Sequence, residues 1–196
     1  MLLPAPTAGR GWRHIRLHRV VACLALLFVG MLAMPHARAN DTSLEYRVKA
    51  GFLFNFAKFV RWPEEVLAPG APLRIGLLAP PDVCGTIERA LADKSVAGHP
   101  LIVERLTEMA TKAPPHMVFM HRSITPVERR LGTLANGHAI LVVGETPDFA
   151  AEGGLIGFTN RGDTLRFQVN LEAAEHAHLQ LSGQLAGLAE IVRPHR

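Results

Sequence analysis

Three short groups of polar residues follow the apolar segments that the sequence predicts as strands, and their side chains could hold a polar ligand. The carboxyl ends of parallel strands meet at one edge of a sheet, where ligands bind in open α/β folds. The alternative for the same residues is ordinary loop solvation and helix capping. The candidate ligand-binding residues are Asp82, His121, Arg122, Ser123, Glu145 and Thr146.

The nucleophilic side chains of the chain form no known catalytic pattern. Ser123, Thr146 and Ser182 lie near the ends of predicted elements, and none has the Gly-x-Ser-x-Gly context of a nucleophile elbow. Cys84 falls in the first turn of a predicted helix, where a thiolate is favoured, but no base converges on it. We therefore expect no catalytic residues and no enzyme activity.

Metal and nucleotide sites are equally unsupported. His176 and His178 are two positions apart on a predicted helix and point in different directions, whereas helical metal ligands need a spacing near four. The turn at residues 79–82 lacks the glycines that let a backbone approach a pyrophosphate. We expect neither a metal nor a cofactor.

The positive charge of the chain is concentrated at its start. The formal net charge is +4, but residues 1–39 contain five arginines and no acid. Residues 40–196 therefore carry 16 basic and 17 acidic residues, a net charge of −1. Because nucleic-acid binding needs a basic face that neutralises phosphates, we expect no nucleic-acid partner.

Residues 1–39 have the three parts of a secretory signal peptide. A head with four arginines precedes fifteen uncharged residues, 20–34, and Ala37-Arg38-Ala39 supplies a cleavage site. The apolar run is shorter than the roughly 20 residues that span a bilayer. We expect removal of residues 1–39, no membrane insertion afterwards, and one domain over 40–196 that lies outside the cytoplasm. Its single cysteine, Cys84, is then either buried, which we favour, or linked to another chain.

Hydrophobic periodicity predicts strands that alternate with helices. Four apolar runs predict buried strands over 73–79, 101–106, 117–120 and 139–143. Segments 155–159 and 164–169 flank a glycine-containing turn and predict an antiparallel hairpin. Helices are predicted over 41–62, 82–91, 125–134, 171–178 and 184–192, with Asp82, Asn170 and Ser182 among the N-caps. In the first helix, an arc of seven apolar residues runs from Val48 to Val60.

This order of elements predicts an α/β fold. We expect a three-layer α/β/α sandwich with a mostly parallel central sheet of about five to six strands, a terminal β-hairpin and helices on both faces.

Two features predict a protein-binding surface. Phe54 falls outside the apolar arc of the first helix, beside Arg61, and exposed aromatic residues are enriched at interfaces. Leu185 and Leu188 belong to a narrow apolar stripe that packs either on the sheet or on a partner. The candidate partner-binding residues are Phe54, Arg61, Leu185 and Leu188.

The chain resembles the YfiR family of periplasmic proteins from Glu45 to Val192. The aromatic helix that ends in Trp62-Pro63, joined with an Asn-Leu pair and a Leu-x-Leu-Ser tail, is the most specific part of this resemblance. The segments that carry it are 54–63, 153–156, 167–171, 179–182 and 185–189.

The resemblance implies a periplasmic, non-enzymatic regulator. Such a protein would bind the periplasmic sensor part of a membrane-anchored diguanylate cyclase, inhibit it, and thereby lower cyclic-di-GMP signalling and biofilm formation. The well-known members have internal disulfides, whereas residues 40–196 contain one cysteine, so an internal disulfide is not available here. The identity of the partner and a homodimer stay open. The alternative function is that of a stand-alone periplasmic module for a small ligand.

Overall fold

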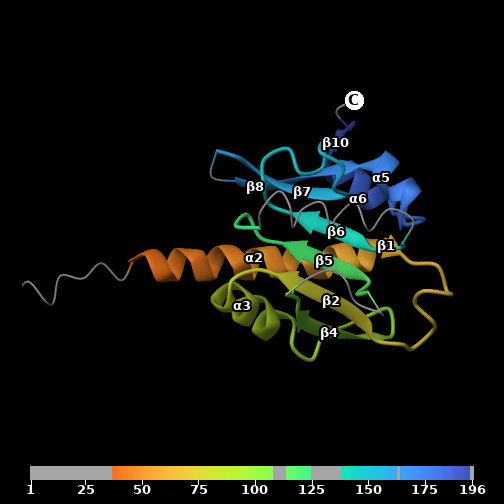
Figure 1. Cartoon of the computed structure of the whole chain (residues 1–196), viewed down its shortest axis with the longest axis horizontal. Coiled ribbons are helices and arrows are strands. Elements are labelled where there is room, and N and C mark those ends of the chain that lie inside the picture. The colour runs from red at the N-terminus through yellow and green to blue at the C-terminus, as the bar shows by residue number, and fades with distance from the viewer. Residues whose placement is uncertain (1–36, 108–113, 125–137, 163, 195–196) are drawn as a thin grey trace, which may run out of the picture. The chain divides into compact units, whose positions relative to one another are not determined.

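An eight-stranded, mostly parallel sheet is the centre of the folded unit, which spans Thr42–Arg196 (Figure 1). The computed structural model describes residues 37–107, 114–124, 138–162 and 164–194. The strand order is β10-β8-β7-β6-β5-β2-β4-β3. The bounds are β2 Leu73–Leu78, β3 Ser95–Val96, β4 His99–Arg105, β5 Met117–Met120, β6 Leu141–Gly144, β7 Ile156–Arg161, β8 Thr164–Asn170 and β10 Glu190–Val192.

The structure confirms the α/β class and the mostly parallel sheet. Strands β4, β2, β5, β6 and β7 run parallel, and β7 pairs antiparallel with β8 as the predicted hairpin. The expected count of five to six strands was too low, because the sequence signal misses two short edge strands, β3 and β10. A further short pair joins β1, Val60–Arg61, to β9, Gln180–Leu181, and ties the end of the first helix to the C-terminal region.

Side chains of the central strands alternate between two apolar clusters. Met117 and Phe119 enter a large cluster on one face of the sheet, while Val118 and Met120 enter a smaller one on the other face. The all-apolar sequences of β5 and β6 follow from this arrangement, since all eight of their residues are buried.

The helices contribute to the larger cluster. They are α2 Ala37–Phe59, α3 Pro81–Leu91, α5 Leu171–His176 and α6 Gly183–Leu188. Their buried apolar residues, such as Leu53, Ile87, Ala174 and Leu185, pack on the same face of the sheet. The helix predicted over 125–134 lies outside the described residues.

Of the three predicted N-caps that lie in the described residues, two are confirmed. The Asn170 side chain accepts a hydrogen bond from the Ala173 N–H at 3.0 Å, and Ser182 Oγ accepts one from Leu185 at 3.2 Å. The Asp82 cap was wrong, because α3 begins one residue earlier, at Pro81, with Pro80 in the N-cap position. Proline suits this first helical position because its missing N–H would have no helical partner there.

The last predicted helix was wrong in its second half. α6 ends at Leu188, and residues 190–192 form β10, which pairs parallel with β8 through Ile191 and Val169. β-Branched side chains suit a strand, and pairing with β8 decides what local periodicity leaves ambiguous.

The buried face of α2 is rotated from the predicted one. Val48, at one edge of the apolar arc, is exposed, while Ala50, just beyond the opposite edge, is buried. The helix also ends at Phe59 rather than at Trp62, because Val60 and Arg61 pair with β9.

Candidate functional site

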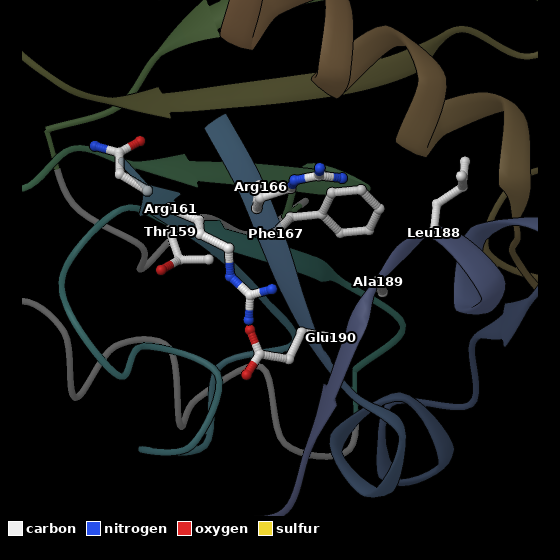
Figure 2. A pocket seen from close by; sticks show the side chains of 8 residues that line it. Thr159, Arg161, Arg166, Phe167, Leu188, Ala189 and Glu190 are labelled. Atoms are coloured by element: carbon white, nitrogen blue, oxygen red, sulfur yellow. The ribbon is translucent and has the colours of Figure 1, made fainter. Parts of the chain in front are cut away.

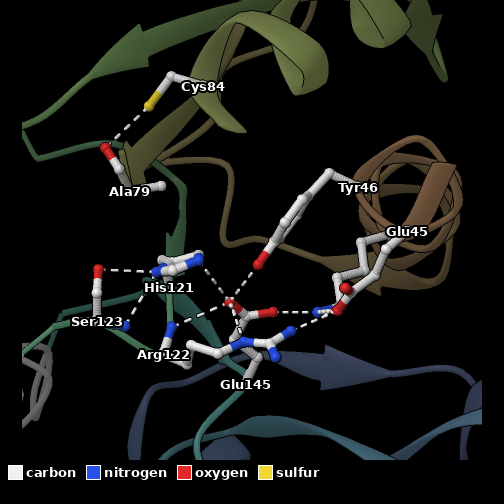
Figure 3. A network of polar contacts seen from close by, with 9 residues as sticks. Glu45, Tyr46, Ala79, Cys84, His121, Arg122, Ser123 and Glu145 are labelled. Carbon is white, nitrogen blue, oxygen red and sulfur yellow. Dashed lines mark hydrogen bonds and ion pairs between the residues drawn. The ribbon is translucent and has the colours of Figure 1, made fainter. Parts of the chain in front are cut away.

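The sheet topology gathers polar residues at one edge. β2 lies between β4 and β5, so the chain reverses its direction across the sheet at β2, a point where open α/β sheets bind ligands. The segments that follow β5 and β6 meet here, and they bring His121, Arg122, Ser123 and Glu145 together as the sequence predicted (Figure 3). The prediction of ligand binding for these residues stays a prediction.

A buried ion pair between Lys49 and Glu145 is the centre of the cluster. Both side chains are only 2 % exposed, and the Lys49 ammonium donates to Glu145 Oε2. The Tyr46 hydroxyl donates to Glu145 Oε1 at 3.0 Å, and the Lys49 ammonium lies 4.7 Å from the centre of the Tyr46 ring. The pair therefore joins α2 to the end of β6 inside the core.

Two further charged residues close the cluster toward solvent. Arg122 donates its backbone N–H to Glu145 Oε1 at 3.0 Å, and its half-exposed guanidinium contacts Glu45 Oε1 at 2.5 Å. Glu45 also accepts a hydrogen bond from the Lys49 ammonium at 2.5 Å. We call these four residues, Glu45, Lys49, Arg122 and Glu145, the clasp; its two cations and two anions balance.

His121 sits at the side of the clasp in a tight turn. Its Nδ1 accepts the Ser123 N–H at 2.9 Å and lies 2.8 Å from Ser123 Oγ, while its Nε2 lies 3.4 Å from Glu145 Oε1. The imidazole packs against the Tyr46 ring with centroids 5.6 Å apart. The ring is thus held by three separate elements.

The electrostatics of the cluster follow from burial and from the ion pair. Burial opposes the charge on Glu145, but the hydrogen bond and charge of Lys49 and the Arg122 amide outweigh it and hold the pKa of this carboxyl below its usual value. Burial and the Glu145 carboxylate raise the pKa of Tyr46 far above that of a free phenol. At neutral pH the cluster therefore consists of ionised Glu145 and a neutral Tyr46 hydroxyl.

The prediction from sequence missed the three residues that α2 contributes: Glu45, Tyr46 and Lys49. A signal for two of them was present, because the helical rotation of about 100° per residue places Tyr46 and Lys49 inside the apolar arc. A charged residue within an apolar arc indicates a buried partner, since an unpaired buried charge is costly.

The other two predicted ligand residues lie at the margin of the cluster. Asp82 is exposed in the first turn of α3, and its charge acts on His121 without a hydrogen bond to it among the described residues. Thr146 is buried, and its backbone carbonyl accepts the Phe149 N–H at 3.2 Å.

Cys84 is buried, as we favoured from the sequence. Its thiol donates to the Ala79 carbonyl at 3.3 Å, and burial raises the pKa of the thiol. The side chain is therefore a packed thiol rather than an activated nucleophile.

Phe54 lies on α2, and Arg61 follows the helix in β1. The half-buried Phe54 ring has the ammonium groups of Lys58 and Lys94 each 5.6 Å from its centre. Arg61 is exposed and lines two neighbouring grooves of about 430 and 490 Å³, one beside Trp62 and one beside Gln180.

The two leucines of the last helix have opposite environments. Leu185 is 2 % exposed and belongs to the larger core cluster, so of the two alternatives left open by the sequence it packs in the core and is not available to a partner. Leu188 is 69 % exposed and lines a groove of about 410 Å³ beside β8 and β10 (Figure 2). Arg161, Arg166 and Glu190 also line this groove, and Arg161 points toward Glu190 in the figure.

The described ranges contain neither a metal-ligand cluster nor a membrane-spanning helix. No three histidine, cysteine, aspartate or glutamate side chains gather there as metal ligands would. In the same part of the chain, no helix is both long and apolar enough to cross a bilayer.

The fold and the site define a small α/β domain whose central charges pair with one another and whose grooves lie open on its surface. The chain belongs to the YfiR/HmsC-like family, whose model matches residues 46–190. This is a regulatory, non-catalytic family of periplasmic proteins that is associated with diguanylate cyclase signalling. Comparison with curated proteins returned no match.

Proposed function

We propose that this protein binds the periplasmic sensor part of a membrane-anchored diguanylate cyclase and holds the cyclase inactive, which lowers cyclic-di-GMP. The observation that carries the proposal is the family match over residues 46–190. Export after removal of residues 1–39, with 40–196 as the single working domain, belongs to the same proposal.

The groove around Leu188 supports this kind of contact. Leu188 exposes most of its side chain, and Arg161 and Arg166 line the same groove, with Glu190 beside Arg161. An exposed leucine beside two guanidinium groups fits a partner segment that has apolar and acidic side chains. Arg61 and Phe54 extend the proposal to the outer side of α2.

The polar cluster does not favour the alternative of a small-ligand module. Every charged group of the clasp already contacts an opposite charge within the protein. A ligand would therefore have to displace an internal ion pair. Inhibition by surface contact does not require an internal ion pair to be displaced. A hundredfold shift between active and inactive cyclase takes about 2.7 kcal/mol of difference in binding free energy.

The direct test measures cyclic-di-GMP synthesis. Membranes that contain a diguanylate cyclase encoded beside this chain are assayed with and without the purified protein on the periplasmic side. We expect saturable inhibition, together with binding of the isolated sensor part in calorimetry. Unchanged synthesis and no binding would refute the proposed function.

Surface variants test where the partner binds. We expect Leu188→Asp to weaken inhibition at least tenfold, because the variant loses the apolar contact and places a negative charge against the acidic side chains proposed for the partner segment. Leu44→Asp is the matched control, since Leu44 is an exposed leucine on α2, outside the groove. Equal inhibition by both variants would remove the Leu188 groove from the proposal.

Phe54→Ala needs a stability measurement beside the inhibition assay. Because Phe54 packs partly against the core, the variant is expected to lose some stability. A loss of inhibition with the melting temperature nearly unchanged supports a contact role. A large drop in melting temperature would show that Phe54 is a core residue.

A further inference from the structure

His121 lies beside the clasp as a neutral imidazole. Its Nδ1 accepts the Ser123 N–H, so this nitrogen must present a lone pair, and the proton of the neutral ring lies on Nε2, which faces Glu145. The same turn is closed by a hydrogen bond from the Ile124 N–H to the His121 carbonyl at 3.0 Å.

A second proton on His121 would disturb both the turn and the charge balance. Protonated Nδ1 can no longer accept the Ser123 N–H, so two donors would face each other at 2.9 Å. The groups that act on the ring are Glu145, Arg122, Asp82 and, from α2, Lys49, while the Tyr46 ring packs against it. Each charge of the clasp is already paired, so the added positive charge is repelled by Arg122 and Lys49 while burial keeps it from water.

We propose that the clasp is an acid-sensitive lock between the N-terminal half of α2 and the ends of β5 and β6. Protonation of His121 opens the 121–124 turn, which carries the Arg122 amide and guanidinium away from Glu145 and Glu45. The Lys49–Glu145 pair then gains access to water, and residues 44–50 of α2 detach locally. This inference concerns the fold and stands independently of the proposed partner.

The direction of the pH effect is set by the environment of the ring. Burial, together with Arg122 and Lys49, outweighs Glu145 and lowers the pKa of His121 below 6.5 in the closed state. The open state therefore binds the proton more strongly. The stabilisation of the closed clasp is fully present above about pH 6.5, the pKa of a free histidine. It is lost as the pH falls through the lower pKa that His121 has in the closed state.

The rest of the fold has its own anchors and keeps α2 from leaving entirely. Phe56 packs on Phe167 and Phe158 with ring centroids 5.1 and 5.9 Å apart. Beyond it, β1 pairs with β9 at Val60 and Arg61. Opening at the N-terminal half is thus local unfolding rather than global unfolding.

Amide hydrogen exchange, corrected for the intrinsic effect of pH, tests the lock in the full chain. Between pH 7.5 and 5.0 we expect exchange at residues 46–50 and 121–124 to accelerate severalfold, because the open state binds the proton more strongly than the closed state. Amides of β5 should not change. His121→Gln, which stays neutral at every pH, should abolish the acceleration.

His116→Gln is the matched control. His116 is another histidine whose pKa burial lowers; its Nδ1 accepts the Arg74 N–H and its Nε2 contacts the Val66 carbonyl. This variant should keep the acceleration at 46–50. The proposal is overturned if exchange at residues 46–50 does not change with pH, or if it accelerates in His121→Gln as much as in the wild type. If His121→Gln does not fold, an NMR titration of the wild-type ring decides: a pKa below 6.5 supports the lock, and one at or above 6.5 overturns it.

Discussion

At the scale of single residues, Lys49 is the least expected feature of the protein. A lysine is almost never fully buried unless it is paired, and here its partner Glu145 is equally buried. The two charges come from α2 and from the end of β6, 96 positions apart. Loss of either partner leaves an uncompensated charge in the core, which is more harmful than loss of both.

This asymmetry gives a prediction that urea unfolding can check. Lys49→Met should lower the free energy of unfolding by about 3–5 kcal/mol. Lys49→Met combined with Glu145→Gln should recover a large part of that loss. Arg105→Met is the control, because the Arg105–Glu88 pair is bidentate but largely exposed and should matter little. A double variant with a lower free energy of unfolding than Lys49→Met alone would contradict the role of the pair.

At the scale of elements, the junction of β8 and α5 depends on one side chain. Asn170 is buried, caps α5 through Ala173, and donates its amide to the Ala150 carbonyl at 2.9 Å. It therefore joins a strand, a helix and the loop after β6. Within the described residues, the side chain of Ser182, the other confirmed cap, makes only the capping hydrogen bond.

The two caps should respond differently to substitution. Asn170→Ala removes a cap and leaves a buried carbonyl unsatisfied, so we expect a loss of about 2–4 kcal/mol. Ser182→Ala removes a cap alone and should lose about 1 kcal/mol. Asn170→Ser keeps a capping oxygen but loses the amide donor, and should fall between wild type and Asn170→Ala. Thermal unfolding of the three variants measures the order, and equal losses would contradict the double role of Asn170.

At the scale of the whole molecule, the folded unit begins at Thr42, close to the expected cleavage site. The family match begins at residue 46, also after that site. The segment expected to be removed, residues 1–39, thus lies outside both the folded unit and the family match.

Export and processing follow as a prediction. Protein recovered from the periplasm should begin near Asn40, as intact mass and N-terminal sequencing will report, and should unfold cooperatively in one transition. Cys84 should react slowly with a thiol reagent until the protein unfolds, because the side chain is buried. A full-length chain retained in the membrane fraction would contradict the signal peptide.

Sequence reasoning succeeded where local pattern and topology agree. The strands β2, β5 and β6 and the β7–β8 hairpin are marked by apolar or alternating runs with turn residues between them, and they formed within one or two residues of the predicted ends. The Asn170 and Ser182 caps act within four residues of sequence, so local chemistry determines them. Parallel strands bring their carboxyl ends to one edge, which is why His121, Arg122 and Glu145 could be placed together in advance.

Only the tertiary structure decided which charges meet. Ion pairing between α2 and the strand ends depends on how the helix is rotated over the sheet, and an apolar arc nearly half a turn wide does not determine that rotation. The same holds for β10, whose three residues become a strand because β8 offers them hydrogen bonds. The sequence alone determines the short-range periodicity of the strands and helices. Folding brings distant segments together, and this produces the Lys49–Glu145 ion pair, the pairing of β10 with β8 and the burial of Leu185. Packing and the avoidance of unpaired buried charge then select one arrangement of these segments.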